Sequence, residues 1–452
     1  MITVNNILTR NGNGREVISI EKVKNALCNT KQICSDGHSL YLQIEDGFLW
    51  KKLDNDANLS LRMYLFNKEA QAKISKGLMD QVIKDLIVDT NILVDIKNIN
   101  PFNYVNFRNG IYSLNEKKLY DKGDKAVANM MFSYMINVDF ITAESPLKQM
   151  PVFTKFIQST FKCDVKSDYF VYILQNLGFL MTSINYLRKV VVLIGAPASG
   201  KSTLANFLSS VIFPESVVSH VNFQDLGDKF RLYNAAYAKL NVGDEMNKGR
   251  IKNLANFKSL TAGEPVVIER KGHDPFWIRP NVRQLYCTNY LPNFDDGNAM
   301  AIFDRLNIIP FYETVNDANR DYGLLEKLQK ERDSIVSRAV EEFADVLKNN
   351  GCFTVPNKVK EYKKRCIMSE RSVEEFIENY IVEDRTFKGV SSVEVYNLYK
   401  NFCKLNGFKI KNQTDLREGI LAKYANVEYK RKRLAPATNV WSLCGITIKE
   451  SC

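Results

Sequence analysis

The sequence predicts an α/β protein built around a parallel sheet, with a mixed N-terminal domain and a C-terminal domain of helices and a hairpin. Strand and helix signals alternate densely between residues 189 and 311, a pattern typical of parallel sheets. A β-branched run at 189–194 suits a strand that is buried on both faces. Beyond residue 372, helical segments are followed by a hairpin pattern.

Composition places the chain among globular proteins of several domains. The 452 residues are 45% hydrophobic and 25% charged, which suffices for more than one core. The net charge of +11 favours a polyanionic partner, although many basic proteins bind none. No apolar stretch reaches the length of a membrane span, and the first residues do not form a signal peptide. We therefore expect a soluble cytoplasmic protein of a bacterial host cell, without membrane contact.

Cysteine and histidine usage argues against a structural metal site. The nine cysteines are scattered and include no C-x-x-C pair, which predicts free thiols in a reducing compartment. The three histidines, His38, His220 and His273, do not lie at metal-ligand spacing from a cysteine pair. The only metal that we expect is Mg²⁺ bound together with a nucleotide.

A phosphate-binding loop follows the strand at 189–194. The pattern G-x-x-x-x-G-K-S begins at Gly195 and ends at Ser202. Its glycines would let backbone N–H groups face a β-phosphate, while Lys201 reaches the β- and γ-phosphates and Ser202 holds Mg²⁺. A helix at 203–211 would direct its positive end at the same anion. Because strand, loop and helix occur in this order, we prefer this interpretation to a chance glycine-rich turn. The predicted nucleotide-binding residues are Gly195, Ala196, Pro197, Ala198, Ser199, Gly200, Lys201, Ser202 and Thr203.

Two further strands end in polar residues that an ATPase requires. Residues 240–242 lead into Asp244, a candidate ligand of Mg²⁺, and Glu245 follows as the residue that would polarise the attacking water. A pair of acids at a surface turn is the alternative, which the position about forty residues after the loop disfavours. The strand predicted at 282–289 ends in Asn289, a candidate contact of the γ-phosphate. ATP and Mg²⁺ are the predicted cofactors.

A hairpin and an arginine complete this region. Residues 266–278 predict two apolar arms with a basic tip at 271–274, and an ordinary exposed turn is the alternative. Arg305 directly precedes another predicted strand, where it would either form a salt bridge within its own fold or act on a neighbouring subunit.

Taken together, these motifs resemble those of the superfamily 3 helicases, most closely the poxvirus-type and phage or plasmid primase-helicase group. The resemblance is most specific over residues 193–311. It implies a P-loop AAA+ core that forms a ring, expected as a homo-hexamer, with single-stranded DNA in the channel. It also implies that Lys271 and His273 at the hairpin tip contact the DNA backbone, and that Arg305 completes the ATP site of the adjacent subunit. Where the family frequently has two arginines this chain has one, which leaves Arg305 alone in that role.

The C-terminal pattern is the layout of a winged helix. Helices are predicted at 373–381, 392–405 and 414–424, and a hairpin follows at 427–446. The last of these helices would enter the major groove of a duplex while the hairpin follows the phosphates. A winged helix that only packs against the ring or a partner protein is the alternative. The hairpin residues expected to contact DNA are Lys430, Arg431, Lys432 and Arg433.

The expected domain organisation follows from these patterns. We expect an accessory region at 1–100, a mixed strand and helical domain at 101–188, the ATPase core at 189–350 and the winged helix at 372–452. Additional helices are predicted at 68–86, at 151–181 and at 321–348, and an Asn109-Gly110 turn is predicted between two strands. The basic run at 358–365 is either a linker or, as we prefer, the solvated face of a helix.

Three functions compete on this evidence. The first is an ATP-driven, ring-forming DNA helicase for replication of a phage, plasmid or mobile genetic element. The second is an AAA+ initiator or helicase loader that uses ATP as an assembly switch without unwinding, and the third is a DNA-tethering protein whose ATP site stabilises assembly. The basic hairpin tip favours the first. Asp54 and Asp56 lie in a polar stretch without flanking strands, so we interpret them as a surface loop and expect no priming activity.

Overall fold

The computed structural model divides the chain into two compact units. The first comprises residues 1–247, 253–291 and 309–355, and the second comprises 248–252, 292–308 and 356–452. The residues that the structure describes are 1–44, 49–53, 57–95, 99–127, 130–142, 149–244, 250–251, 254–272, 274–291, 293–294, 299–316, 320–384, 386, 389–408, 410–435 and 438–449. Among these residues, no helix is long and apolar enough to cross a membrane.

A five-stranded sheet forms the centre of the first unit. Its strands, in spatial order, are β10 (Val218–Ser219), β11 (Leu240–Asp244), β15 (Arg283–Thr288), β9 (Val190–Gly195) and β17 (Leu306–Phe311). The strands from β10 to β9 run parallel to one another. Strands β9 and β15 are buried almost throughout. The near-continuous apolar sequence of β9 is typical of a sheet covered on both faces, whereas β15 also buries Arg283 and Gln284. The predicted parallel α/β core is confirmed.

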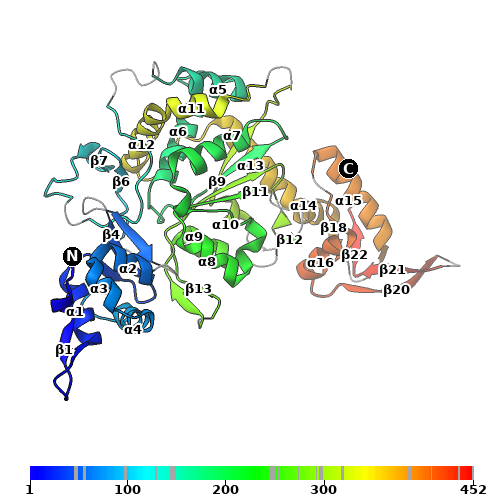
Figure 1. Ribbon diagram of the computed structural model, residues 1–452. Coiled ribbons are helices and arrows are strands. Elements are labelled where there is room, and N and C mark those ends of the chain that lie inside the picture. Colours follow the sequence, from blue (N-terminus) through cyan, green and yellow to red (C-terminus); the bar gives the residue numbers. More distant parts are fainter. Residues whose placement is uncertain are drawn as a thin grey trace. The chain divides into compact units, whose positions relative to one another are not determined.

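Helices surround this sheet (Figure 1). The helix after β9, α7 (Lys201–Asn206), continues as a π-helical turn over Phe207–Ile212, so the predicted helix at 203–211 is present and begins two residues earlier. Helices α8 (Lys229–Tyr237) and α9 (Ala255–Ala262) follow along the chain. Short 3₁₀ segments, Glu215–Val217 and Phe223–Gly227, complete the connections.

Four helices gather at one side of the sheet in Figure 1: α5 (Pro151–Phe161), α6 (Asp168–Met181), α11 (Leu324–Lys330) and α12 (Arg332–Lys348). Helices α6 and α12 approach so closely that a β-carbon at Gly178 would lie 2.0 Å from the carbonyl oxygen of Ala339. Only glycine fits such a helix crossing. Segments from before and after the sheet therefore form one helical layer.

Small antiparallel sheets accompany the core. Strands β6 (Tyr104–Phe107), β7 (Gly110–Ser113) and β8 (Lys118–Tyr120) form a meander, and the predicted Asn109-Gly110 turn joins the first two. Strands β13 (Val266–Ile268) and β14 (Phe276–Ile278) pair as the arms of the predicted hairpin.

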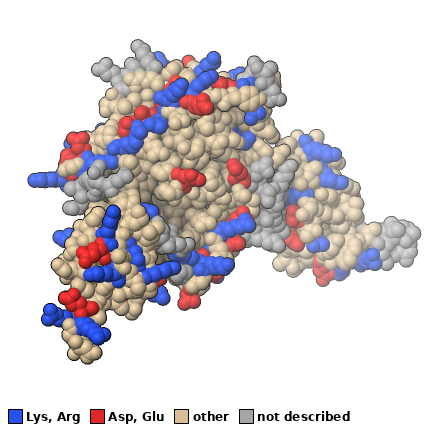
Figure 2. Space-filling model, in the orientation of Figure 1, with Lys and Arg blue, Asp and Glu red and all other residues tan. Residues whose placement is uncertain are grey.

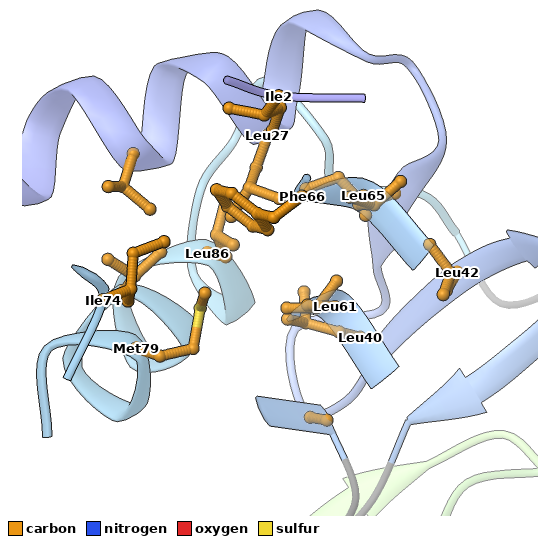
Figure 3. Packing of buried hydrophobic residues seen from close by; sticks show 14 of the residues in the cluster. Ile2, Leu27, Leu40, Leu42, Leu61, Leu65, Phe66, Ile74, Met79 and Leu86 are labelled. Carbon is orange, nitrogen blue, oxygen red and sulfur yellow. The ribbon is translucent and has the colours of Figure 1, made fainter. Parts of the chain in front are cut away.

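The N-terminal residues form a separate apolar cluster within the first unit. Its elements are η1 (Val4–Asn6), β1 (Leu8–Arg10), β2 (Glu16–Ile18), α1 (Ile20–Asn29), β3 (Ile33–Ser35), β4 (Leu40–Ile44), β5 (Leu49–Leu53), α2 (Ala57–Leu65), α3 (Lys68–Lys73) and α4 (Lys76–Ile87). Phe66, fully buried, lies beside Leu27 and Leu86 in this cluster (Figure 3). The prediction of one helix at 68–86 is wrong, because Ile74 is extended and the Ser75 side chain accepts a hydrogen bond from the Leu78 amide to start a new helix.

The second unit is built mainly from the C-terminal residues. Its elements are β12 (Arg250–Ile251), β16 (Asn293–Phe294), α10 (Ala299–Phe303), α13 (Asn357–Glu370), α14 (Ser372–Tyr380), β18 (Ile381–Glu383), β19 (Val390–Ser391), α15 (Ser392–Asn406), α16 (Gln413–Lys423), β20 (Glu428–Ala435), β21 (Thr438–Cys444) and β22 (Ile446–Ile448). The three helices and the hairpin predicted beyond residue 372 are all present. Their core contains Phe376, Tyr399, Leu416 and Leu443. The basic run at 358–365 lies on α13, mostly exposed, as predicted for a solvated helix face.

Candidate nucleotide-binding site

The loop between β9 and α7 depends on its two glycines. A β-carbon at Gly195 would lie 2.4 Å from the carbonyl oxygen of Phe311, so β9 passes β17 at a distance that only glycine allows. Gly200 has a φ of +97°, and a β-carbon there would lie 2.9 Å from the ring of Phe156. Both glycines are thus required by backbone geometry.

The side chain of Lys201 folds back over this loop. Its Nζ donates to the carbonyl oxygens of Gly195 at 2.8 Å and Ala196 at 2.7 Å, and to Ser199 Oγ at 3.3 Å. The residue is only 7% exposed. These bonds hold the ammonium group against the loop. An anion bound there would accept a strong charge-assisted hydrogen bond from it.

The loop is also tied to the segment that follows β17. The Val315 amide donates to the Ala198 carbonyl oxygen at 3.0 Å. Ala198 itself has a φ of +58°, an uncommon value for alanine that this contact helps to hold. Contacts within the protein therefore contribute to the shape of this loop.

The carboxyl ends of three neighbouring parallel strands bring the other predicted residues to this loop. Asp244 at the end of β11 is in register with Cys287 on β15, which is in register with Leu193 on β9. Asn289 directly follows β15. In open parallel sheets, ligands bind beyond the carboxyl ends of strands, which is where these residues meet.

The charges of Asp244 and Lys201 both act on the thiol of Cys287. Burial raises the pKa of its thiol to about 12, and the negative charge of Asp244 adds to this rise while the positive charge of Lys201 opposes it. The thiol is therefore neutral at physiological pH. Asp244 and Lys201 are thus both near enough to Cys287 to act on its thiol with opposite sign.

A pocket of about 990 Å³ lies over these strand ends. The predicted site residues that line it are Pro197, Ala198, Ser199, Gly200, Lys201, Ser202, Thr203, Asp244 and Asn289. Gly195 and Ala196 take part through the carbonyl oxygens that hold Lys201. Ser202 and Asp244, both exposed at this pocket, provide a hydroxyl and a carboxylate oxygen, the hard donors that Mg²⁺ prefers when phosphate supplies its other ligands.

The other half of the pocket wall consists of residues that the sequence analysis did not identify. They belong to α5 and to the segment from Val315 to Lys327: Pro151, Val152, Lys155, Phe156, Ser159, Thr160, Val315, Arg320, Asp321, Leu324 and Lys327. Helical spacing marked Phe156 only as an apolar residue of a helix. Nothing local in the sequence indicates that two segments more than 150 residues apart line one pocket.

Four of these residues, Lys155, Arg320, Asp321 and Lys327, add charge to the pocket lining. Lys327 Nζ lies 2.7 Å from Asp321 Oδ2. This hydrogen bond holds the pKa of Asp321 below its usual range, and Lys155 contributes to the same effect. Together with Lys201, the pocket therefore presents several cations and few acids, as a polyphosphate ligand requires.

One carboxylate joins the two helical walls. Glu331, between α11 and α12, accepts hydrogen bonds from the Val152 and Phe153 amides of α5, both at 2.9 Å. A carboxylate at a helix N-terminus satisfies amides that lack partners within the helix. The bond fixes α5 relative to α11 across the pocket.

A polar network anchors β11 below the site. Asn241 is fully buried, and its Oδ1 accepts from Ser219 Oγ at 2.7 Å and from the Val221 amide at 2.8 Å. Its Nδ2 donates to Gln284 Oε1 at 3.0 Å, which links β11 to β15. A buried network of this kind fixes strand position, so it sets where Asp244 emerges.

The remaining predicted residues lie elsewhere. Glu245 and His273 lie outside the described residues, as do Asp54 and Asp56. Lys271 is exposed at the tip of the β13–β14 hairpin. The other residues are in the second unit.

Arg305 belongs to this second unit, where its Nη1 donates to the Ala301 carbonyl oxygen at 2.9 Å. Its buried Nε has no hydrogen-bond partner among the described residues. Lys430, Arg431 and Lys432 lie on β20, and of Arg433 only the backbone in β20 is described.

The end of the β13–β14 hairpin nearest its tip is contacted by neighbouring elements of the first unit. The ring of His38 stacks on Phe276 at 4.2 Å between centroids. Lys229 at the start of α8 forms an ion pair with Glu269 at 2.7 Å. His38 of the N-terminal residues and Lys229 of α8 thus both contact the hairpin near its tip, where Lys271 remains exposed.

Residues 193–305 match DUF5906, described as a family of unknown function, and no functionally curated protein matches the sequence. An A-form apo structure of the NrS-1 C-terminal region is similar at 12% identity, covering 93% of this chain and 98% of that chain with a TM-score of 0.45. A further apo structure of that region gives 13% identity, the same coverages and a TM-score of 0.44. TM-scores below 0.5 do not establish a common fold. The family match covers the segment from the phosphate loop to Arg305.

Proposed function

We propose that this protein is an ATP-dependent, ring-forming DNA helicase of the superfamily 3 type, acting in replication of a phage, plasmid or other mobile genetic element. One observation carries the proposal. Lys201, Cys287 and Asp244 line a single pocket at the carboxyl ends of β9, β15 and β11. A lysine on a glycine-rich loop opposite a strand-end carboxylate is the arrangement that binds a nucleoside triphosphate with Mg²⁺.

The loop would bind the phosphates of ATP. Backbone amides from Ala196 to Thr203 would face the β-phosphate, and Lys201 would exchange its bonds to loop carbonyls for bonds to the β- and γ-phosphates. Ser202 and Asp244 would hold Mg²⁺, which neutralises charge on the phosphates when bound. The base and ribose would occupy the half of the pocket lined by α5 and by Leu324.

Hydrolysis requires a base and a contact to the γ-phosphate. Glu245 immediately follows Asp244 in the chain, and we assign it the role of orienting and deprotonating the attacking water. Asn289, at the end of the next strand of the sheet, would donate to the γ-phosphate. We assign Arg305 to the site of the adjacent subunit, where its guanidinium would stabilise charge in the transition state.

DNA contacts are assigned to two places. The exposed Lys271, with His273 beside it, would follow the backbone of a single strand in the channel of a ring, expected to be a hexamer. In the second unit, α14, α15 and α16 followed by the β20–β21 hairpin have the order of a winged helix, which would bind duplex DNA.

An AAA+ initiator or helicase loader is the second candidate. It would use the same pocket as an assembly switch, so the pocket alone does not separate the two functions. The basic tip of the β13–β14 hairpin favours the helicase, because a loader has no need for a cation that follows a single strand.

A strand-displacement assay tests the proposal. Full-length protein, ATP and Mg²⁺ are mixed with a forked duplex, and Lys201→Ala serves as the inactive control and Lys166→Ala as a matched lysine variant outside the pocket. We expect unwinding by the wild type and by Lys166→Ala only, with rings in electron micrographs. Hydrolysis and ring formation without unwinding would support the loader, and absence of hydrolysis would refute both.

A further inference from the structure

The hairpin of the second unit carries a stack of cationic and aromatic side chains. The rings of Tyr429 on β20 and Trp441 on β21 are stacked at 4.8 Å with 15° between their planes. The guanidinium of Arg417 on α16 lies over Tyr429 at 4.9 Å, and that of Arg431 on β20 lies over Trp441 at 5.8 Å. The stack thus runs from α16 onto the hairpin in the order Arg417, Tyr429, Trp441, Arg431.

Strand alternation divides the basic residues of β20 between two faces. Arg431 pairs directly with Trp441 across the hairpin and shares a face with Tyr429, two residues away. Lys430 and Lys432 point to the other face. On that face Lys430 forms an ion pair with Glu428, and the pKa of Glu428 is held below its usual range by Lys430 first and then by Lys432. The two lysines are therefore partly neutralised by a neighbouring acid.

The face that carries the stack retains its positive charge. Among the described residues no carboxylate pairs with Arg431, which is exposed, and Arg417 has only a loose contact of 3.8 Å with Glu418. Trp441 remains 47% exposed. Figure 2 shows that basic and acidic side chains are interspersed over the surface of the chain.

Stacking leaves the guanidinium groups free to bind anions. An arginine that lies flat on an aromatic ring uses its faces for that contact, while its N–H donors stay in the plane and point outward in a fork that matches phosphate oxygens. The rings fix both arginines, so less side-chain entropy is lost when a phosphate binds. Beside Arg417, a pocket of about 80 Å³ lined by Ser392, Gln413 and Thr414 offers further polar groups.

We propose that the stack of Arg417, Tyr429, Trp441 and Arg431 is the surface by which the second unit binds the phosphodiester backbone of duplex DNA, and that the face bearing Lys430 and Lys432 does not contact it. This inference rests on the duplex binding assigned above. It narrows that assignment from a run of four basic residues to one face of the strand, and adds Arg417 and the two aromatic residues. Duplex DNA fits because its regularly spaced phosphates can meet two arginines held apart on one rigid surface.

Salt-dependent binding of a labelled duplex to the full-length protein tests the face assignment. Arg431→Ala and Arg417→Ala each remove one charge from the stack, while Lys430→Ala and Lys432→Ala remove one charge from the opposite face of the same strand. We expect each arginine variant to lower the slope of log affinity against log salt by about one unit. Each lysine variant should keep the wild-type slope. Arg431→Lys keeps the charge but not the forked donors of the guanidinium. Its slope should lie between those of the wild type and Arg431→Ala.

Trp441 supplies an independent readout. Duplex DNA should change the tryptophan fluorescence of the wild type, and Trp441→Phe should remove that change while Trp277→Phe keeps it. Thermal unfolding of every variant identifies any that fail to fold, and Arg431→Ala at an exposed strand position should unfold as the wild type does.

The outcomes separate this inference from the proposed function. If the wild type binds duplex DNA and all four alanine variants lower the slope of log affinity against log salt equally, the face assignment is wrong while duplex binding stands. If only the Lys430 and Lys432 variants lower this slope, the face that carries these lysines binds DNA. If the wild type does not bind duplex, or the stack variants lose only a protein interaction, the assigned duplex binding fails as well.

Discussion

Gly200 lies directly against Phe156, so that the phosphate loop and helix α5 touch where a β-carbon would come within 2.9 Å of the ring. The left-handed φ of +97° adds backbone strain for any other residue. We expect Gly200→Ala to cost about 1–3 kcal/mol in the loop conformation. ATP affinity, measured by isothermal titration or by a fluorescent analogue, should fall about 5- to 150-fold.

Gly227→Ala is the matched control, because no atom lies within 4 Å of a β-carbon there and its φ is not positive. Phe156→Ala combined with Gly200→Ala should recover only the steric part of the loss. Wild-type ATP affinity in Gly200→Ala would show that the loop tolerates a rearrangement that the present packing excludes.

Lys201→Ala and Glu245→Gln should fail at different steps. Without the ammonium group of Lys201 the γ-phosphate loses its cation, so hydrolysis should be abolished and ATP binding weakened. Glu245→Gln should still bind ATP but turn it over very slowly, since only the base is lost. Parallel binding and phosphate-release assays distinguish the two, and near-native turnover by either variant would contradict the assignment.

Arg305 should act on the adjacent subunit. Arg305→Ala and Lys201→Ala proteins, each inactive alone, should partly restore hydrolysis when mixed, because some interfaces then combine an intact loop with an intact arginine. A double variant, Lys201→Ala with Arg305→Ala, mixed with Arg305→Ala cannot form such an interface and is the control. If mixed assembly is verified and no activity returns, Arg305 is a structural residue, held by Ala301.

Lys271 should separate hydrolysis from unwinding. Because it lies at the exposed hairpin tip and not among the residues that line the nucleotide pocket, Lys271→Ala should retain basal ATPase activity and lose strand displacement. Lys348→Ala removes an exposed lysine from the end of α12 and should change neither activity. Full unwinding by the double variant Lys271→Ala with His273→Ala would show that the hairpin tip is an ordinary surface turn without a role in DNA contact.

Lys239 should make stability depend on pH. Burial lowers the pKa of its amine well below 10.5, and the charge of Arg283 lowers it further. The unfolded chain therefore binds more protons than the folded chain between the lowered pKa and 10.5, so stability rises with pH in that window. Relative to Lys239→Met, the wild type should gain up to about 1.4 kcal/mol per pH unit.

Chemical denaturation of both proteins between pH 6.5 and 8.5 measures this difference, and the comparison cancels the titration of other groups. Lys348→Met is the control for removal of a lysine. A difference that stays constant with pH would mean that Lys239 keeps its proton inside the fold, held by Thr182 and Ser183, whose oxygens accept from it at 2.5 and 2.7 Å.

The sequence predicted the core well because its signals are local. The apolar run of β9, the glycine positions and the polar residues that end β11 and β15 each depend on a few adjacent residues, and parallel strand ends necessarily meet at one edge. The hairpin of β13 and β14 and the helices beyond residue 372 followed from periodicity in the same way.

Contacts between distant segments were not predictable from such patterns. Phe156 has the spacing of any apolar helix residue, yet it packs against Gly200. Asp321 and Lys327 follow the sheet, while Lys155 precedes it, and only the helical layer brings them to one pocket. The break between α3 and α4 escaped detection because apolar spacing continues through Ile74, whereas the capping side chain of Ser75 decides where a helix starts.

The carboxylate of Glu331 has a mechanical consequence for nucleotide exchange. The carboxylate of Glu331, at the junction of α11 and α12, accepts hydrogen bonds from the first turn of α5. These bonds couple the two helical walls of the pocket. A nucleotide bound as proposed would therefore enter and leave through the solvent-facing opening of the pocket, and not by separation of α5 from α11.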